Sequence, residues 1–143
     1  MHTAALTFNI NKALPPPQHQ VRETVSKFLG NSIRLNANAE FLNLIIEEWL
    51  TNLTAHGCLE QTEHVASMML TDLGSVIKIR LEDDCPAFDP TALPTPHLEA
   101  PLEERQVGGL GVHMIRSLVS QVRYQRVDGK NLWELERQID TPL

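Results

Sequence analysis

The sequence predicts a two-layer α/β (α+β) sandwich, in which helices cover one face of a mostly antiparallel sheet. Strand-like and helix-like segments follow one another in the order strand, helix, helix, strand, strand, helix, strand, strand. Each of the two later strand pairs is joined by a short turn, as in hairpins. The chain has 143 residues, a length that suits one domain with its own core. We therefore expect a single domain over residues 1–143.

The first strand and the first helix are separated by prolines. Residues 5–10 alternate between apolar and polar side chains, which indicates a strand. Pro17 is suited to the first turn of a helix, and Gly30 is a typical helix end. These two positions predict a helix from about Gln18 to Leu29.

The second helix is expected from about Ala37 to Ala55, with Asn36 or Asn38 as its N-cap. His56 and Gly57 would end it. Its apolar residues recur at helical spacing, at Leu42, Ile45, Ile46, Trp49, Leu50 and Leu53. We interpret Trp49, like Trp133 near the end of the chain, as a core or interface aromatic.

The remaining strands form two predicted hairpins with a long irregular segment between them. Asp72-Leu73-Gly74 and Asp128-Gly129 are the turn signals. The strands span residues 63–71, 75–83, 122–127 and 132–138. From residue 86 to residue 107 the chain contains five prolines and no period, which is typical of a functional lid or of disorder. We interpret residues 90–109 as a lid, followed by a helix from about Gly111 through Val119.

Composition excludes several classes of protein. The net charge of −6 argues against a nucleic-acid surface, which usually needs a basic face. No apolar run is long enough for a membrane-spanning helix, and the first residues do not resemble a signal peptide. Cys58 and Cys85 are not a CxxC pair, so a zinc site is not indicated, while a disulfide stays open. We expect a cytoplasmic protein.

A polar stripe follows the second helix, because Glu48, Asn52 and His56 are four residues apart. The stripe borders the apolar face, so it meets the edge of the core. An amide oxygen there can bind Mg²⁺, and a carboxylate one turn away can orient or deprotonate a nucleophile. The alternative is a solvated helix flank, with His56 helping to end the helix.

A second candidate is Asp83, which ends a row of inward-facing apolar residues at Ile77, Ile79 and Leu81. Burying a carboxylate is costly unless a donor reaches it, and the exocyclic amine of a purine would be a suitable donor. The alternative is that Asp83 only leads into a turn.

The third candidate is the glycine run at residues 108–111, directly before a helix. Glycines let the backbone approach a ligand, and a helix N-terminus offers N–H groups to a phosphate. The sequence has no P-loop motif, and the run follows the lid rather than a strand, which argues against a dinucleotide fingerprint. An ordinary flexible loop is the alternative.

In this order and separation, the three features resemble the GHKL superfamily of histidine-kinase-like ATPases, in the form of the anti-sigma-factor serine/threonine kinases. Residues 48–57, EWLTNLTAHG, are similar to the N box E-A-x-T-N-A-x-x-H-G. Residues 82–90, EDDCPAFDP, resemble the first glycine box D-D-G-x-x-F-D-P, and residues 108–116, GGLGVHMIR, resemble the second. The resemblance extends over about residues 5–138.

The resemblance implies a Bergerat-type ATP-binding fold with ATP and Mg²⁺ as cofactors. It makes Glu48 the general base or the group that orients the attacking hydroxyl, and Asn52 the Mg²⁺ ligand. Asp83 would accept a hydrogen bond from the adenine amine, and Phe88 would pack under the nucleotide. Arg105 in the lid is our own candidate for a charge near the γ-phosphate. The expected phosphate-binding lid residues are Gly108, Gly109, Leu110 and Gly111.

The activity that the resemblance implies is phosphorylation of a STAS-domain antagonist and sequestration of a sigma factor or another output protein, often by a homodimer. Cys85 and Ala87 stand where the family has glycines. If Cys85 needed a positive φ, it would cost about 1 kcal/mol, so we predict a bent or shifted adenine pocket and weaker affinity. A non-catalytic nucleotide-binding module that sequesters a partner is the main alternative. A detached histidine-kinase catalytic domain is disfavoured, because no long helical segment carries a substrate histidine.

Overall fold

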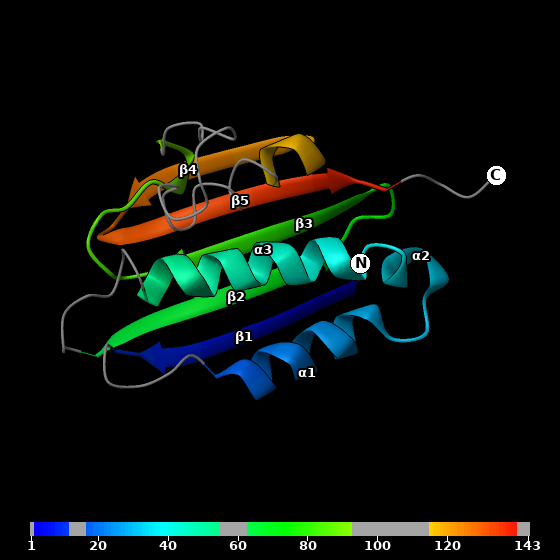
Figure 1. The fold of residues 1–143 in the computed structure, drawn as a ribbon, viewed down its shortest axis with the longest axis horizontal. Coiled ribbons are helices and arrows are strands. Elements are labelled where there is room, and N and C mark those ends of the chain that lie inside the picture. Colours follow the sequence, from blue (N-terminus) through cyan, green and yellow to red (C-terminus); the bar gives the residue numbers. More distant parts are fainter. Residues whose placement is uncertain (1, 12–16, 55–62, 93–114, 140–143) are drawn as a thin grey trace, which may run out of the picture.

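The computed structural model describes residues 2–11, 17–54, 63–92 and 115–139. Five antiparallel strands form one sheet in the order β1-β2-β3-β5-β4, and α1 and α3 lie side by side on one of its faces (Figure 1). This arrangement confirms the predicted sandwich. The elements are β1 (His2–Ile10), α1 (Gln18–Leu29), α2 (Ile33–Asn36), α3 (Ala39–Asn52), β2 (His64–Asp72), β3 (Val76–Asp83), the 3-10 turn η2 (Pro90–Ala92), β4 (Gln121–Val127) and β5 (Lys130–Gln138).

The core lies between the sheet and the two long helices. Every second residue of a strand and the residues on one face of each helix point into this core, as the sequence pattern predicts. Each fully buried aliphatic side chain contributes roughly 1.5–3 kcal/mol relative to exposure. Among the largest fully buried side chains are Phe28 of α1, Leu42, Ile45 and Ile46 of α3, Leu70 of β2, and Ile77, Ile79 and Leu81 of β3.

The first helix begins and ends where the sequence places it, at Gln18 and Leu29. Gly30 follows with a φ of 50°, in the left-handed region that favours glycine. Its N–H donates to the carbonyl of Ser26 at 2.9 Å, which satisfies one of the last free carbonyls of the helix. The prediction of this helix is confirmed.

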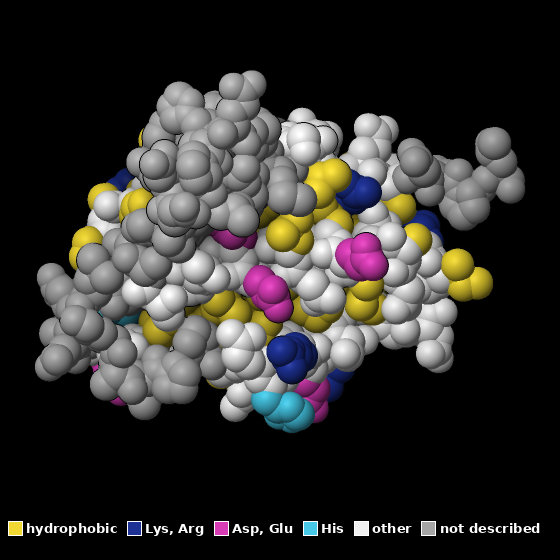
Figure 2. All heavy atoms as spheres, viewed as in Figure 1, with side chains coloured by type: hydrophobic (Ala, Val, Ile, Leu, Met, Phe, Trp, Pro, Cys, Tyr) yellow, Lys and Arg dark blue, Asp and Glu magenta, His cyan; other side chains and the backbone are white. Residues whose placement is uncertain are grey.

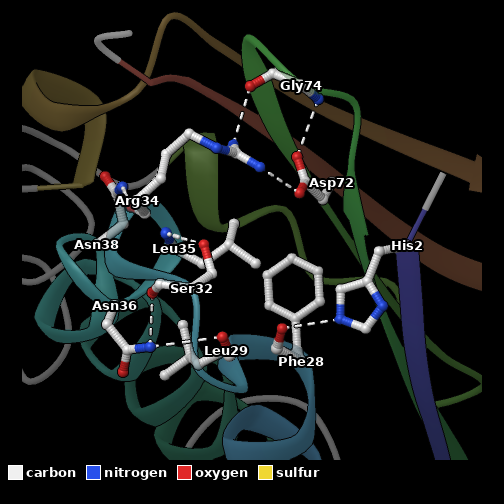
Figure 3. Close-up of polar contacts among 10 residues, drawn as sticks. All are labelled: His2, Phe28, Leu29, Ser32, Arg34, Leu35, Asn36, Asn38, Asp72 and Gly74. Atoms are coloured by element: carbon white, nitrogen blue, oxygen red, sulfur yellow. Dashed lines mark hydrogen bonds and ion pairs between the residues drawn. The ribbon is translucent and has the colours of Figure 1, made fainter. Parts of the chain in front are cut away.

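The segment before α3 differs from the prediction. A separate short helix, α2, is capped by Ser32, whose hydroxyl accepts from the N–H of Leu35 at 3.1 Å. Asn38 occupies the N-cap position of α3, but its side chain makes no capping bond there. Instead its amide nitrogen donates to the carbonyl of Arg34 at 3.0 Å. Asn36 donates back to carbonyls at the end of α1 (Figure 3), so neither predicted asparagine caps α3 through its side chain.

Both predicted hairpins are present. β2 pairs with β3 and β4 pairs with β5, each antiparallel. Gly74 takes a φ of 93° in the first turn. In the second, Asp128 and Gly129 have φ of 52° and 75°, the signature of a type I′ turn that matches the twist of the strands.

One ion pair links α2 to the β2–β3 turn (Figure 3). The guanidinium of Arg34 donates to the carboxylate of Asp72 and, at 2.9 Å, to the carbonyl of Gly74. The N–H of Gly74 donates to the same carboxylate at 2.9 Å. The hydrogen bond from Arg34 is the main cause that lowers the pKa of Asp72, while desolvation opposes it.

Replacing Arg34 with methionine is expected to lower the free energy of unfolding at pH 7 by about 0.5–1 kcal/mol. Because the pKa of Asp72 is lower in the folded state than its ordinary value of 3.8, this stability is present above pH 3.8 and is lost as pH falls through the folded pKa. Urea unfolding from pH 7 down to pH 3 measures the difference. Arg22→Met, on the exposed side of α1, is the control. A deficit that stays constant down to pH 3 would contradict the ion-pair account.

Candidate functional site

A pocket lies where the last turn of α3 meets the edge of the inner sheet face. Its space is about 30 Å³, roughly room for one water molecule. In this conformation it is too small for a purine, so a bound base requires the lining side chains to move. The lining residues are Trp49, Asn52, Leu53, Leu81, Asp83, Phe88, Tyr124, Asn131, Leu132 and Trp133.

Asn52 is the last residue of α3 and is 4% exposed. Among the described residues, neither polar atom of its buried side-chain amide has a hydrogen-bond partner. Such an amide costs about 1–3 kcal/mol when nothing satisfies it. A Mg²⁺–nucleotide group that meets this amide would satisfy it, so the residues present fit the cofactor that the sequence analysis expects.

Glu48 lies one helical turn before Asn52, on the same side of α3. It is half-buried, and its carboxylate oxygen Oε1 is buried. The structure thus places Glu48 and Asn52, the two described residues of the polar stripe, at the edge of the core rather than on a solvated flank. Asn52 lines the pocket, while Glu48 lies outside the lining.

Asp83 ends the inward row of β3, as predicted, and is 7% exposed. Its oxygen Oδ1 accepts from the side-chain amide of Asn131 at 2.8 Å and from the N–H of Cys85 at 3.0 Å. Desolvation raises the pKa of Asp83, and these two hydrogen bonds oppose the rise. Since both bonds end on Oδ1, a ligand donor that reached Oδ2 would further favour the ionised carboxylate.

Asn131 is a pocket residue to which the sequence analysis gave no role. Its Oδ1 accepts from the hydroxyl of Tyr124 at 2.6 Å and from the N–H of Phe88 at 3.2 Å. Its Nδ2 donates to Asp83 and to the carbonyls of Cys85 and Pro86. One buried amide therefore fixes the segment that follows β3. The available signal was an amide two residues after the Asp128-Gly129 turn, on the inward face of β5.

The strain expected at Cys85 is absent. Among the described residues other than glycine, only Asp128 has a positive φ. Cys85 is fully buried, and its carbonyl accepts from Arg126 at 2.8 Å and from Asn131. The premise of a positive φ at Cys85 was therefore wrong, while the shifted adenine pocket and the weaker affinity stay predictions.

A cluster of His64, Asp84 and Cys85 places potential metal ligands within 4.8 Å of one another. The carboxylate of Asp84 lies 3.2 Å from Nδ1 of His64 and accepts from the N–H of Val65 at 2.8 Å. Cys85 is disulfide-bonded, so it does not present the thiolate that zinc binds. We assign no metal to this cluster.

The other predicted site residues fall into two groups. Phe88 lines the pocket beside Asp83, as a residue that packs under a nucleotide would. His56 and the predicted lid residues lie outside the described residues. The predicted lid residues are Arg105, Gly108, Gly109, Leu110 and Gly111.

The face that carries α1 and α3 shows charged side chains of both signs, single over α3 and grouped at the lower edge, where α1 lies (Figure 2). Apolar side chains emerge between them. No helix in the described part of the chain has the length and apolar character needed to cross a membrane.

The sequence pattern of the histidine kinase-like ATPase domain matches residues 13–135. The chain belongs to this family, which confirms the GHKL resemblance, and the five-stranded sheet with helices on one face agrees with its fold. The particular relative found by comparison is the serine/threonine-protein kinase BtrW of Bordetella bronchiseptica. It is 29% identical over 99 residues, which cover 68% of this chain and 70% of that protein.

Proposed function

We propose that this domain is an ATP-dependent serine/threonine kinase of a partner-switching system, acting in the cytoplasm. Its substrate would be a serine or threonine of a STAS-domain antagonist, and it would also sequester a sigma factor or another output protein, as a homodimer. The observation that carries the proposal is the unpartnered buried amide of Asn52, one turn after Glu48 and in the same pocket as Asp83. The similarity to a serine/threonine kinase supports the reaction class.

Each residue has a chemical task in this proposal. The amide oxygen of Asn52 would hold Mg²⁺, which supplies charge stabilisation to the phosphates. Asp83 would accept from the adenine amine through Oδ2, with Asn131 fixing its orientation. Glu48 would orient the attacking hydroxyl and accept its proton as the new oxygen–phosphorus bond forms, the bond from the γ-phosphorus to the β–γ bridging oxygen breaks, and ADP leaves.

The lid has the remaining tasks. Backbone N–H groups at Gly108, Gly109, Leu110 and Gly111 would bind the phosphates. Arg105 would place a positive charge near the γ-phosphate.

A second candidate function is a sequestering module without catalysis. The small pocket favours it, since about 30 Å³ is open between the lining side chains and a nucleotide would need more. In that case ATP would be at most a structural ligand.

Intact-mass analysis after incubation with Mg-ATP and a STAS-domain protein encoded nearby tests the proposal. One phosphate added to the partner, and stable to acid as a phosphoserine or phosphothreonine is, is the expected result. Partner that stays unmodified but co-elutes with this protein would overturn the kinase and support the sequestering module. An acid-labile phosphate on a histidine of this chain would instead indicate a histidine-kinase domain.

A further inference from the structure

Trp133 of β5 is a second residue in the pocket with an unsatisfied polar group. The side chain is 4% exposed, and its buried Nε1 has no hydrogen-bond partner in the part of the chain that the structure describes. An indole N–H is a donor only, so no rotation of a hydrogen can satisfy it within the pocket. A buried donor without a partner is uncommon in folded proteins and calls for an explanation such as a missing ligand.

The register of the sheet places this donor near the Asp83 carboxylate. Asp83 pairs with Asn131 across β3 and β5, and Leu81 pairs with Trp133. Asp83 and Trp133 are therefore diagonal neighbours on the inward face, a relation that places residues about 7 Å apart, within reach of long side chains. Both line the same pocket, so an acceptor and a donor border one space.

Other polar side chains that line the pocket either have hydrogen-bond partners already or lie on another side of it. Asn131 uses both ends of its amide, and the hydroxyl of Tyr124 donates to it at 2.6 Å. Burial raises the pKa of Tyr124, so that hydroxyl keeps its proton. The amide of Asn52 is also unpartnered, but it belongs to α3, on the side where the phosphates are proposed to bind. The indole of Trp133 is thus the buried, unpartnered donor that the strand register places beside Asp83.

We propose that Trp133 is a specificity-determining residue, whose Nε1–H donates to a purine ring nitrogen while Asp83 accepts from the adjacent exocyclic amine. Adenine offers an amine donor next to a ring-nitrogen acceptor, whereas guanine offers an oxygen acceptor in place of the amine. The acceptor on Asp83 and the donor on Trp133 therefore match adenine. If guanine were bound in the same position, its oxygen acceptor would face the acceptor on Asp83, which is unfavourable. This inference rests on the proposed nucleotide binding, but not on catalysis.

Trp133→Phe tests the role, because phenylalanine keeps an aromatic ring and removes the donor. Calorimetry with Mg-ATP and Mg-GTP should show about a tenfold loss of ATP affinity and a smaller loss of GTP affinity. The ratio of ATP affinity to GTP affinity should therefore fall in the variant. Thermal unfolding without nucleotide shows whether the variant stays folded. Met68→Leu is the control, because it changes a fully buried side chain of β2 outside the pocket with little change in volume, and it should leave ATP affinity unchanged.

Wild-type protein provides a second measurement that does not depend on the folding of a variant. One deaza analogue of ATP lacks the N1 acceptor and another lacks the N7 acceptor. Wild-type protein should bind one of these two analogues more weakly than ATP, by about the factor that Trp133→Phe loses for ATP. Equal losses for ATP and GTP in Trp133→Phe, or full affinity for both analogues, would overturn the inference alone. Wild-type protein that binds neither ATP nor GTP would overturn the proposed function as well.

Discussion

Replacing Glu48 with glutamine is expected to lower phosphotransfer to the STAS-domain partner by about 10²–10⁴-fold. The amide keeps the shape of the side chain but cannot accept the proton of the attacking hydroxyl. Mg-ATP affinity should not change, because Asn52 and Asp83 line the pocket and Glu48 does not. Transfer is measured as the rate at which the partner gains one phosphate, and affinity by calorimetry.

Glu47 provides a matched control on the same helix. It is exposed, whereas Glu48 is half-buried. Glu47→Gln removes the same charge one position away and should transfer phosphate at the wild-type rate. If Glu48→Gln also transfers at that rate, Glu48 is not the general base, and the role must lie elsewhere.

The second large effect is expected from Asn52→Leu, which should have opposite consequences for binding and for stability. Loss of the proposed metal ligand should weaken Mg-ATP binding by about 100-fold or more. The protein without nucleotide should become more stable, by about 1–3 kcal/mol, because an apolar group of similar size replaces an amide with no partner. Thermal unfolding would show this as a rise of about 2–8 °C in Tm.

Asn43→Leu on the exposed side of α3 is the control, and it should change neither quantity by much. A variant at position 52 that binds Mg-ATP normally would refute the role of this amide. A variant that loses stability together with binding would indicate a structural role for Asn52 instead.

Local signals in the sequence were sufficient for most of the elements. Pro17 and Gly30 bound α1 correctly, because proline and glycine act through backbone angles that do not depend on the rest of the fold. Asp128-Gly129 is equally local, and the turn it predicts is present. α2 was missed because its four residues form a single turn, too short to show a period. β1 begins at His2, three residues earlier than predicted, because pairing with β2 rather than alternation extends it.

The site was less accessible to sequence reasoning. Glu48, Asn52 and Asp83 could be singled out because each interrupts an apolar pattern at a defined spacing. Asn131, by contrast, makes five hydrogen bonds, four of them to residues at least 43 positions away, and no spacing along the chain indicates those four. The same holds for Trp133, whose unsatisfied N–H becomes visible only once its neighbours are placed.

The strand order also determines when the nucleotide pocket can form during synthesis. β3 pairs with β5, and Asp83 accepts a hydrogen bond from Asn131, which lies 48 residues later in the chain. A ribosome adds residues at about 5–20 per second, so Asp83 emerges some seconds before this partner does. Until β5 has joined the sheet, the Asp83 carboxylate lacks its hydrogen bond from Asn131. The pocket then also lacks the lining residues that β4 and β5 contribute. A nucleotide that binds as proposed would therefore stabilise the domain only after β5 has paired with β3.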